Sequence, residues 1–200
     1  TRVDAVGDFA REIQRRVAIG DGDLLVLRED AGTGTGILAI AAEKLGASSI
    51  EAFDFDPVCI RVSKENAHAN NCRKIEFKIA VSRKVSGFKS AHVILANLFS
   101  ELLIASAPGL AKKLLSGGHL IFSGVLRSQA EEVCRGLEAS GFKKPGLVSR
   151  GKWCAGITSL VFAPAGRRRA CPEGKSSSLN DADLRGIASG FERVQTAIFS

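Results

Sequence analysis

Short apolar runs alternate along the chain with longer segments in which apolar residues recur at helical spacing. The apolar runs predict strands at residues 24–27, 49–53, 75–79, 92–96 and 120–123. The longer segments predict helices at residues 9–17, 37–45, 58–69, 100–115 and 128–140. Parallel strands need a crossover connection, which is usually a helix, so this alternation is typical of βαβ units. The pattern therefore predicts an α/β fold.

Residues that start or stop helices support several of these boundaries. Asp56 is a good N-cap, and Pro57 suits the first position of the helix that follows it. Gly46 is a natural C-cap for the helix at 37–45. Pro108 is expected to kink or restart the helix at 100–115.

Later boundaries rest on glycine and on a capping pattern. Gly117-Gly118 is expected to turn the backbone into the strand at 120–123. Ser128 and Glu131 form a capping box, which opens the helix that runs to residue 140. Alternation of apolar and polar residues at 75–79 predicts that this strand is half buried.

The two ends of the chain differ in character from its middle. We expect a helix and linker at 1–21, a core at 22–163 and a linker-like tail at 164–200 with room for a short helix. The core closes with two strands over 147–162 that are joined by a turn at 150–152. This arrangement predicts an antiparallel hairpin at the end of the sheet.

Composition places the chain among ordinary globular proteins. Its 200 residues suit one domain, and 45% are hydrophobic and 24% charged. Charges interrupt residues 1–20, so no signal peptide is expected, and the apolar stretch at 92–111 is too interrupted to span a membrane. The odd, widely spaced cysteines lack a C-x-x-C pattern, which predicts a reducing cytoplasm and no disulfide framework or zinc site. The histidines add no metal-like spacing, so no metal is expected.

The net charge of +7 is compatible with an acidic partner such as RNA or a ribosomal particle, and equally with a basic surface that has no specific partner. Aromatic residues make up 6% of the chain and include no tyrosine. This scarcity argues against a surface on which nucleic-acid bases stack.

The glycine-rich stretch Asp30-Ala31-Gly32-Thr33-Gly34-Thr35-Gly36 follows the first predicted strand. A tight turn from strand to helix needs residues that tolerate unusual backbone angles and leave room for a ligand. The amides of the helix that follows are then expected to face that ligand. The D-x-G-x-G-x-G order differs from the G-x-G-x-x-G of dinucleotide enzymes, and an acid beside the loop suits a cationic ligand better than a pyrophosphate.

Asp54 ends the second predicted strand, 18 positions after Gly36. A carboxylate there can accept hydrogen bonds from both hydroxyls of a ribose. The simpler alternative is a βαβ unit with a glycine turn and no ligand. Asp54 and the spacing of the glycines favour a nucleoside-containing ligand.

Several stretches of the core carry a resemblance together. They are DAGTGTGILAIAA at 30–42, FDFDP at 53–57, ENAHAN at 65–70, VILANL at 93–98, GGHLIFSG at 117–124, QAEEV at 129–133 and GKW at 151–153. The combination resembles class I S-adenosylmethionine-dependent methyltransferases, and among them the bacterial family that methylates large-subunit ribosomal protein eleven. The resemblance covers about residues 22–163.

This resemblance implies a Rossmann-like fold with helices on both faces of a seven-stranded sheet, six strands parallel and one reversed in the closing hairpin. It implies S-adenosylmethionine as the cofactor and a protein substrate, methylated on a lysine side chain or an N-terminal amine. The candidate cofactor-binding residues are Asp30, Gly32, Thr33, Gly34, Thr35, Gly36, Asp54, Phe55, Ser82 and Asn97.

The sequence departs from the family pattern in four places. The residues before 22 match neither its substrate-recruiting domain nor its linker, including the linker's cofactor-contacting stretch. Arg28-Glu29 intervenes between the first strand and the glycine turn, and Ala80-Val81-Ser82 replaces an acid after the third strand. The tail after Phe162 has no counterpart.

Asn97, which ends the fourth predicted strand, is the candidate catalytic residue. A sulfonium methyl is already activated, so the protein needs to align an unprotonated nucleophile with it. The side-chain carbonyl of Asn97 can accept a hydrogen bond from an amine, although a strand-end Asn also caps turns. The sequence continues Leu98-Phe99 and lacks the Asn-Pro-Pro-aromatic motif of amide- and base-modifying enzymes. Asn66 and Asn70 are expected to stabilise the end of their helix, and Trp153 to pack in the hairpin.

Two alternatives to a protein methyltransferase remain. The same core occurs in enzymes that methylate RNA or small molecules, and the positive charge slightly favours RNA. The chain is alternatively a core that binds a cofactor or a partner without catalysis.

Overall fold

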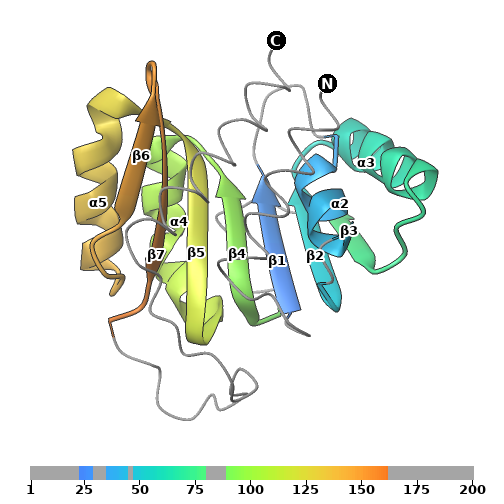
Figure 1. Cartoon of the computed structure of the whole chain (residues 1–200), viewed down its shortest axis with the longest axis horizontal. Helices are drawn as coiled ribbons and strands as arrows, with labels where there is room; N and C mark the ends of the chain where they lie inside the picture. The colour runs from blue at the N-terminus through green and yellow to red at the C-terminus, as the bar shows by residue number, and fades with distance from the viewer. Residues whose placement is uncertain (1–22, 29–34, 45–46, 80–88, 162–200) are drawn as a thin grey trace.

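The structure is a computed structural model that describes residues 23–28, 35–44, 47–79 and 89–161 (Figure 1). Its strands are β1 (Asp23–Arg28), β2 (Ser49–Asp54), β3 (Ile75–Ile79), β4 (Ala91–Asn97), β5 (Leu114–Leu126), β6 (Gly146–Arg150) and β7 (Trp153–Ser159). Its helices are α2 (Ile37–Lys44), α3 (Pro57–Ala69), α4 (Ser100–Lys113), the short 3-10 helix η2 (Arg127–Gln129) and α5 (Ala130–Ala139). The predicted helix at 9–17 and the tail at 164–200 lie outside the described residues.

The strands form one sheet in the order β3-β2-β1-β4-β5-β7-β6. β1 pairs in parallel with both β2 and β4, and only the pairs made by β7 are antiparallel. The chain therefore leaves β1 toward β2 on one side and returns to β4 on its other side. Such a switch point in strand order is where open α/β sheets bind ligands, at the carboxyl ends of the strands.

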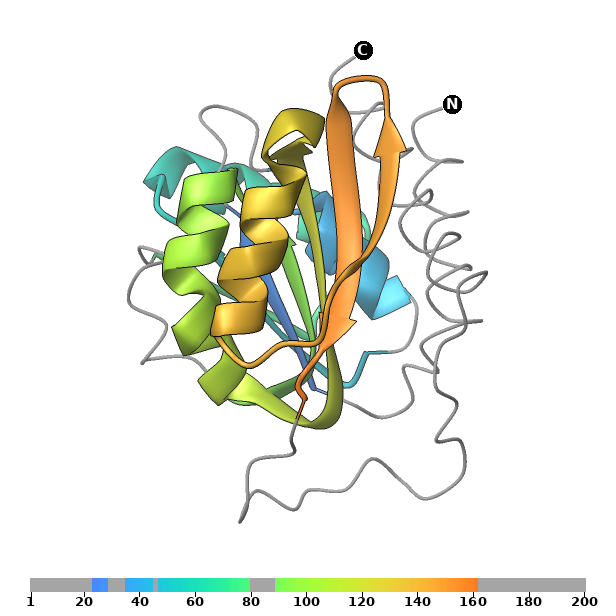
Figure 2. The ribbon, with the colours of Figure 1, turned by 90° about the vertical axis from the view of Figure 1, so that its left-hand side faces the viewer.

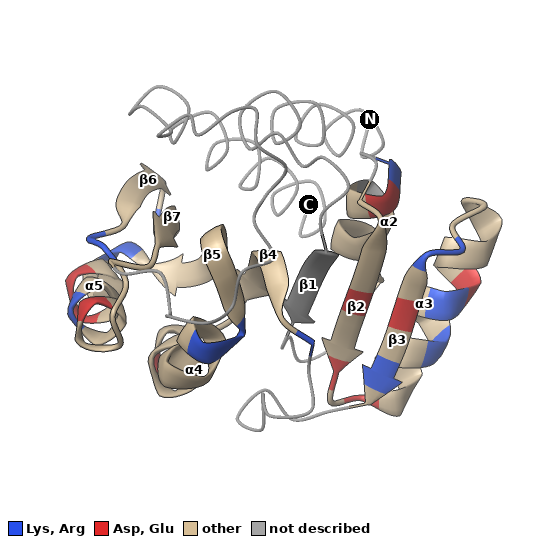
Figure 3. Ribbon diagram, turned by 90° about the horizontal axis from the view of Figure 1, so that it is seen from below, with Lys and Arg blue, Asp and Glu red and all other residues tan. Residues whose placement is uncertain are grey.

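Helices cover both faces of the sheet. Seen along the strands, α2 lies on one side and α4 and α5 lie on the other (Figures 2 and 3). The larger core is formed by residues of β4, β5, α4 and α5, among them the fully buried Phe122 and Leu110. A smaller core joins α2, α3 and β3 through Ile40, Ala67 and Phe77.

Capping explains the start of α3. The side chain of Asp56 accepts a hydrogen bond from the Val58 N–H at 2.8 Å, and Pro57 occupies the first helical position. Both roles confirm the sequence prediction, because Asp satisfies an N–H that the helix leaves free and proline needs no partner there. The predicted hairpin is also confirmed, with β6 and β7 paired around Gly151 and Lys152.

The predicted boundary between the helix and the strand after β4 is wrong. α4 continues through Pro108 without a restart and ends at Lys113. Pro108 is exposed, and losing one backbone hydrogen bond there does not end a helix whose other face is buried. β5 begins at Leu114, six residues before the predicted strand.

Gly117 and Gly118 were predicted to form a turn before the strand. They lie within β5 instead, where its pairing with β4 is irregular. The pairing of β5 with β4 shifts register between Ala91 and His92-Val93. A Cβ on Gly118 would lie 2.6 Å from the His92 carbonyl oxygen, so only glycine permits this close approach.

The predicted capping box at α5 is also wrong. Ser128 lies within η2, and Gln129 is the N-cap of α5 without a side-chain hydrogen bond. η2 adds a 3-10 turn directly before α5, and this turn moves the N-cap position of α5 past Ser128. β3 is half buried as predicted, since Ile75 and Phe77 pack on the smaller core, although Ile79 is exposed.

Candidate functional site

Polar residues form a row across the carboxyl ends of four adjacent strands. The Cα atoms of Arg28 on β1, Asn97 on β4 and Ser123 on β5 are paired in the sheet register. Asp54 ends β2 and stands level with Arg28, one position beyond the last aligned pair of β1 and β2. The row crosses the switch point between β1 and β4, so this edge is the candidate site.

Asp54 is buried at this edge, with 4% of its surface exposed. Its Oδ1 accepts a hydrogen bond from the Asp56 N–H at 2.9 Å, which orients the carboxylate. Phe55, the next residue, is exposed beside it. The structure therefore places both of these candidate residues at the row of strand ends.

Thr35 and Gly36 connect the glycine-rich stretch to α2. Gly36 has a φ of +73°, and its carbonyl oxygen accepts the Ile40 N–H at 2.9 Å as the first hydrogen bond of the helix. The hydroxyl of Thr35 is buried and has no hydrogen-bond partner within the described part of the chain. The other candidates of this stretch (Asp30, Gly32, Thr33 and Gly34), and Ser82, lie outside the described residues.

Asn97 lies at the end of β4 and is 6% exposed. The backbone that follows it is fixed by a hydrogen bond from the Leu98 N–H to the Ser123 carbonyl oxygen at 3.1 Å. Gly124 has a φ of +85°, and a Cβ there would lie 2.8 Å from the Asn97 Oδ1. The absence of a side chain at Gly124 thus makes room for the Asn97 amide.

Sequence reasoning missed Ser123 as a member of this site. It is fully buried, and its hydroxyl has no partner among the residues that the structure describes. A buried hydroxyl without a hydrogen bond costs free energy, so this hydroxyl, level with Asn97 in the sheet, is a candidate for a ligand contact. The available signal was a polar residue that closes the apolar run Leu120–Phe122, the same signal that identified Asp54 and Asn97.

Asn66 was predicted to stabilise the end of its helix, and its carbonyl does accept hydrogen bonds from the Asn70 N–H and side chain. Its side chain also makes a contact that the sequence did not predict. The Nδ2 donates to the Thr35 carbonyl oxygen at 2.9 Å, across 31 positions of sequence. Asn66 therefore touches the backbone beside the glycine-rich stretch.

The loops after β4 and β5 are joined to each other and to the hairpin. The Ser100 hydroxyl contacts the Gln129 Oε1 at 2.8 Å, and the Arg127 N–H donates to the Lys152 carbonyl oxygen at 2.8 Å. Trp153 is partly exposed, with the Lys152 Nζ 5.5 Å from its ring centre. Its packing within the hairpin is therefore incomplete.

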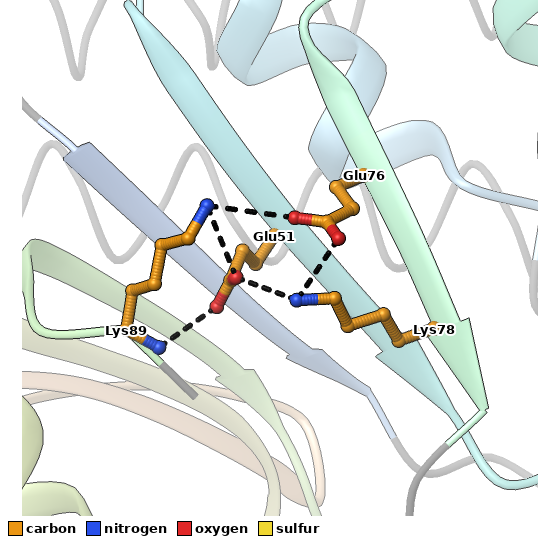
Figure 4. Close-up of polar contacts among 4 residues, drawn as sticks. All are labelled: Glu51, Glu76, Lys78 and Lys89. Atoms are coloured by element: carbon orange, nitrogen blue, oxygen red, sulfur yellow. Dashed lines mark hydrogen bonds and ion pairs between the residues drawn. The ribbon is translucent and has the colours of Figure 1, made fainter. Parts of the chain in front are cut away.

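A cluster of charges lies on the other face of β2, because Glu51 and Asp54 are three positions apart on one strand. Glu51 is buried, and its carboxylate accepts hydrogen bonds from the Lys78 Nζ at 2.8 Å and the Lys89 N–H at 2.9 Å (Figure 4). Burial alone would raise the pKa of Glu51, but these hydrogen bonds and the two lysine charges bring it below its ordinary value. Glu51 is therefore an ionised structural group in this cluster.

None of the described helices is long and apolar enough to cross a membrane. Over the described ranges, no three His, Cys, Asp or Glu side chains gather in an arrangement that would hold a metal ion.

Comparison with known proteins relates this chain to one family. The family described as "Ribosomal protein L11 methyltransferase (PrmA)" matches residues 16–159. A ribosomal protein L11 methyltransferase of Desulforamulus reducens is 40% identical over 66% of this chain and 42% of its own length. One from Bacillus cereus is 32% identical over 72% of this chain and 45% of its own length. The chain spans less than half the length of these curated relatives.

Solved structures of other proteins share the fold of this chain. A ribosomal protein L11 methylase from Lactobacillus delbrueckii subsp. bulgaricus has a TM-score of 0.67 and 29% identity, covering 76% of this chain and 77% of that one. TrmN from Thermus thermophilus shares the fold alone, with a TM-score of 0.61 and 21% identity over 76% of this chain and 48% of that one. The predicted Rossmann-like methyltransferase fold is confirmed. The family match over residues 16–159 shows that this chain belongs to the ribosomal protein L11 methyltransferase family.

Proposed function

We propose that this chain is the catalytic core of an S-adenosylmethionine-dependent methyltransferase that acts on protein amines. The observation that carries the proposal is the row of buried polar residues, Asp54, Asn97 and Ser123, at the switch point of a chain in this family. The acceptor is a lysine side chain or an N-terminal amine of a ribosomal protein. The names of the relatives support that substrate class.

The described residues fit the cofactor. Asp54 is a buried carboxylate whose orientation is fixed by the Asp56 N–H, and it would accept hydrogen bonds from the ribose hydroxyls. Thr35 offers a buried hydroxyl that lacks a partner among the described residues, and Gly36 opens the helix whose amides face the site. Phe55 would cover the base from the exposed side. We assign Asp30, Gly32, Thr33, Gly34 and Ser82 to the same site from their sequence positions.

When bound, S-adenosylmethionine supplies a methyl group already activated by its sulfonium charge. The protein must then hold an amine with its lone pair directed at that methyl. We assign this role to the Oδ1 of Asn97, which would accept a hydrogen bond from an N–H of the amine. The Ser123 hydroxyl, level with Asn97 in the sheet, would accept or donate a second hydrogen bond.

Both groups are neutral and buried. A buried, weakly polar setting disfavours the protonated form of a bound amine and so lowers its pKa. Asn97 and Ser123 would therefore favour the unprotonated amine that methyl transfer needs. We infer a cytoplasmic setting, which the odd number and wide spacing of the cysteines in the sequence support.

The test is methyl transfer from labelled cofactor to separated ribosomal protein and ribosomal RNA fractions. We expect label in the protein fraction, and a loss of about 100-fold in the Asn97→Ala variant because the amine is no longer aligned. Label only in RNA would overturn the substrate class in favour of the RNA alternative. Cofactor binding without transfer to either fraction would support a binding module without catalysis.

A further inference from the structure

The loop that leads into α2 is hydrogen-bonded to α3, the helix that connects β2 to β3. Asn66 lies in the third turn of α3, and its side-chain Nδ2 donates to the Thr35 carbonyl oxygen at 2.9 Å. Asn66 is partly buried, so this bond is shielded in part from competing water. It fixes the orientation of the peptide that joins Thr35 to Gly36.

A second contact joins the same two segments one helical turn earlier. Ser63 and Asn66 are three positions apart and therefore share one face of α3. Ser63 is buried against Gly36, where a Cβ would lie 2.9 Å from the Ser63 Cβ and 3.1 Å from its Cα. Gly36 thus serves close packing of its loop on α3, in addition to its left-handed backbone conformation.

The start of α3 is tied to the other half of the candidate site. The Asp56 N–H donates to Asp54, and the Asp56 side chain caps the helix through the Val58 N–H. The N-cap residue of α3 therefore contacts Asp54, and the helix itself contacts Thr35 and Gly36 farther along. A helix keeps a fixed rise of about 1.5 Å per residue, so α3 sets the separation between the two halves.

From these contacts we propose that Asn66 is a positioning residue for the cofactor site. It acts through Thr35 and Gly36, and it fixes the end of the glycine-rich stretch relative to Asp54. This inference rests on the proposed function, because it assumes that the two halves bind one ligand. A rigid site lowers the ordering cost of binding, so loss of the contact weakens affinity without removing a ligand-contacting group.

The test compares Asn66→Leu and Asn66→Ala with Asn70→Ala in the full chain. Leucine removes the donor while keeping the same branching at Cγ, and it has a higher helix propensity than asparagine, so α3 is preserved. Asn70 is the exposed C-cap of the same helix; its side chain bonds to the Asn66 carbonyl oxygen and makes no hydrogen bond to Thr35 or Gly36, the described residues of the loop. It is the matched control for changes in the helix itself.

Two quantities are measured: the Kd for S-adenosylmethionine by calorimetry, and hydrogen–deuterium exchange at the amides of residues 35–40 without ligand. We expect both Asn66 variants to raise the Kd about 5- to 10-fold, because each loses one hydrogen bond that orders the site. We also expect faster exchange at residues 35–40. The Asn70→Ala variant should match the wild type in both, and Asn66→Leu should keep the thermal midpoint.

An unchanged Kd in Asn66→Leu, with the wild type binding normally, would overturn this inference and leave the proposed function intact. A wild type that does not bind the cofactor would instead overturn the proposed function. In that case unchanged exchange at residues 35–40 in Asn66→Leu would show that the contact does not order the loop either.

Discussion

At the residue scale, the conformation of Asn97 depends on a glycine in the neighbouring strand. Gly124 directly follows Ser123, the sheet partner of Asn97, and has a φ of +85°. A Cβ there would lie 2.8 Å from the Asn97 Oδ1 and 3.0 Å from the Leu98 carbonyl oxygen. The Asn97 side chain can rotate, but the backbone of Leu98 is held by the hydrogen bond from its N–H to the Ser123 carbonyl oxygen, so both a left-handed conformation and close packing require glycine.

Replacing Gly124 with alanine should therefore lower stability by about 2 kcal/mol, part from the left-handed backbone and part from the steric overlap. Gly141→Ala is the matched control. Gly141 has a φ of +91° but no atom within 4 Å of an added Cβ, so only the conformational cost of about 1 kcal/mol applies. Urea unfolding measures both. Equal losses in the two variants would contradict the packing role of Gly124.

The residues of the candidate site were predictable where a single strand carried the signal. Asp54 and Asn97 each end an apolar run, and the carboxyl ends of parallel strands share one edge, so sequence order sufficed to group them. Ser123 gave the same signal but was overlooked. The Asn66 contact was not predictable, because it joins positions 31 residues apart through the packing of α3, which no local pattern encodes.

At the scale of elements, the charged cluster of Figure 4 joins β2, β3 and the segment that enters β4. Lys78 of β3 and Lys89 both bond to the buried Glu51, and both also pair with Glu76. In the described part of the chain, α4 and α5 pack mainly on β4 and β5, and β2 contributes Phe53 to the core that they form. At the β2–β3 end of the sheet, the ion pairs of this cluster therefore contribute to holding the strands together alongside apolar packing.

Glu51→Gln should lower stability at neutral pH by about 2 kcal/mol, because two hydrogen bonds to a buried charge weaken and two lysines lose one of the two carboxylates that they pair with. The folded-state pKa of Glu51 lies below its ordinary value of 4.5, so its stabilisation is present above pH 4.5 and is lost as pH falls through the lower folded-state pKa.

Urea unfolding of the wild type and the variant from pH 7 down to pH 3 measures this difference. The two curves should converge at acid pH. Glu131→Gln is the control, since Glu131 forms an exposed pair with Arg135 on α5 and should change stability little. A gap between wild type and Glu51→Gln that stays constant down to pH 3 would contradict the assignment of Glu51 as an ionised group.

Most elements were predictable because each carries its own periodicity and caps, as at Asp56 and Pro57. The errors lie between α4 and α5, where tertiary packing overrides local signals. Leu114 and Leu115 continue the apolar pattern of α4, yet Leu114 pairs with Ala91 in the sheet. Ser128 and Glu131 have the spacing of a capping box, yet η2 places Ser128 before the cap.

At the scale of the whole molecule, the sheet brings the ends of segments far apart in sequence to one edge. β1 lies between β2 and β4, and the crossovers run in opposite directions from it, so the row from Asp54 to Ser123 is contributed by four βα units. The chain covers 42% of one curated relative and 45% of another. The proposed cofactor site lies at this edge of the sheet, within the residues that match the family.

The most direct measurement is calorimetric titration of S-adenosylmethionine into the wild type and into Asp54→Ala. The wild type should bind with one site per chain. Loss of the two hydrogen bonds that the buried carboxylate would accept from the ribose hydroxyls should raise the Kd at least about 30-fold in the variant. Circular dichroism of both proteins checks that the fold is kept. No binding by the folded wild type, or equal affinity in the two proteins, would contradict the cofactor site at this edge.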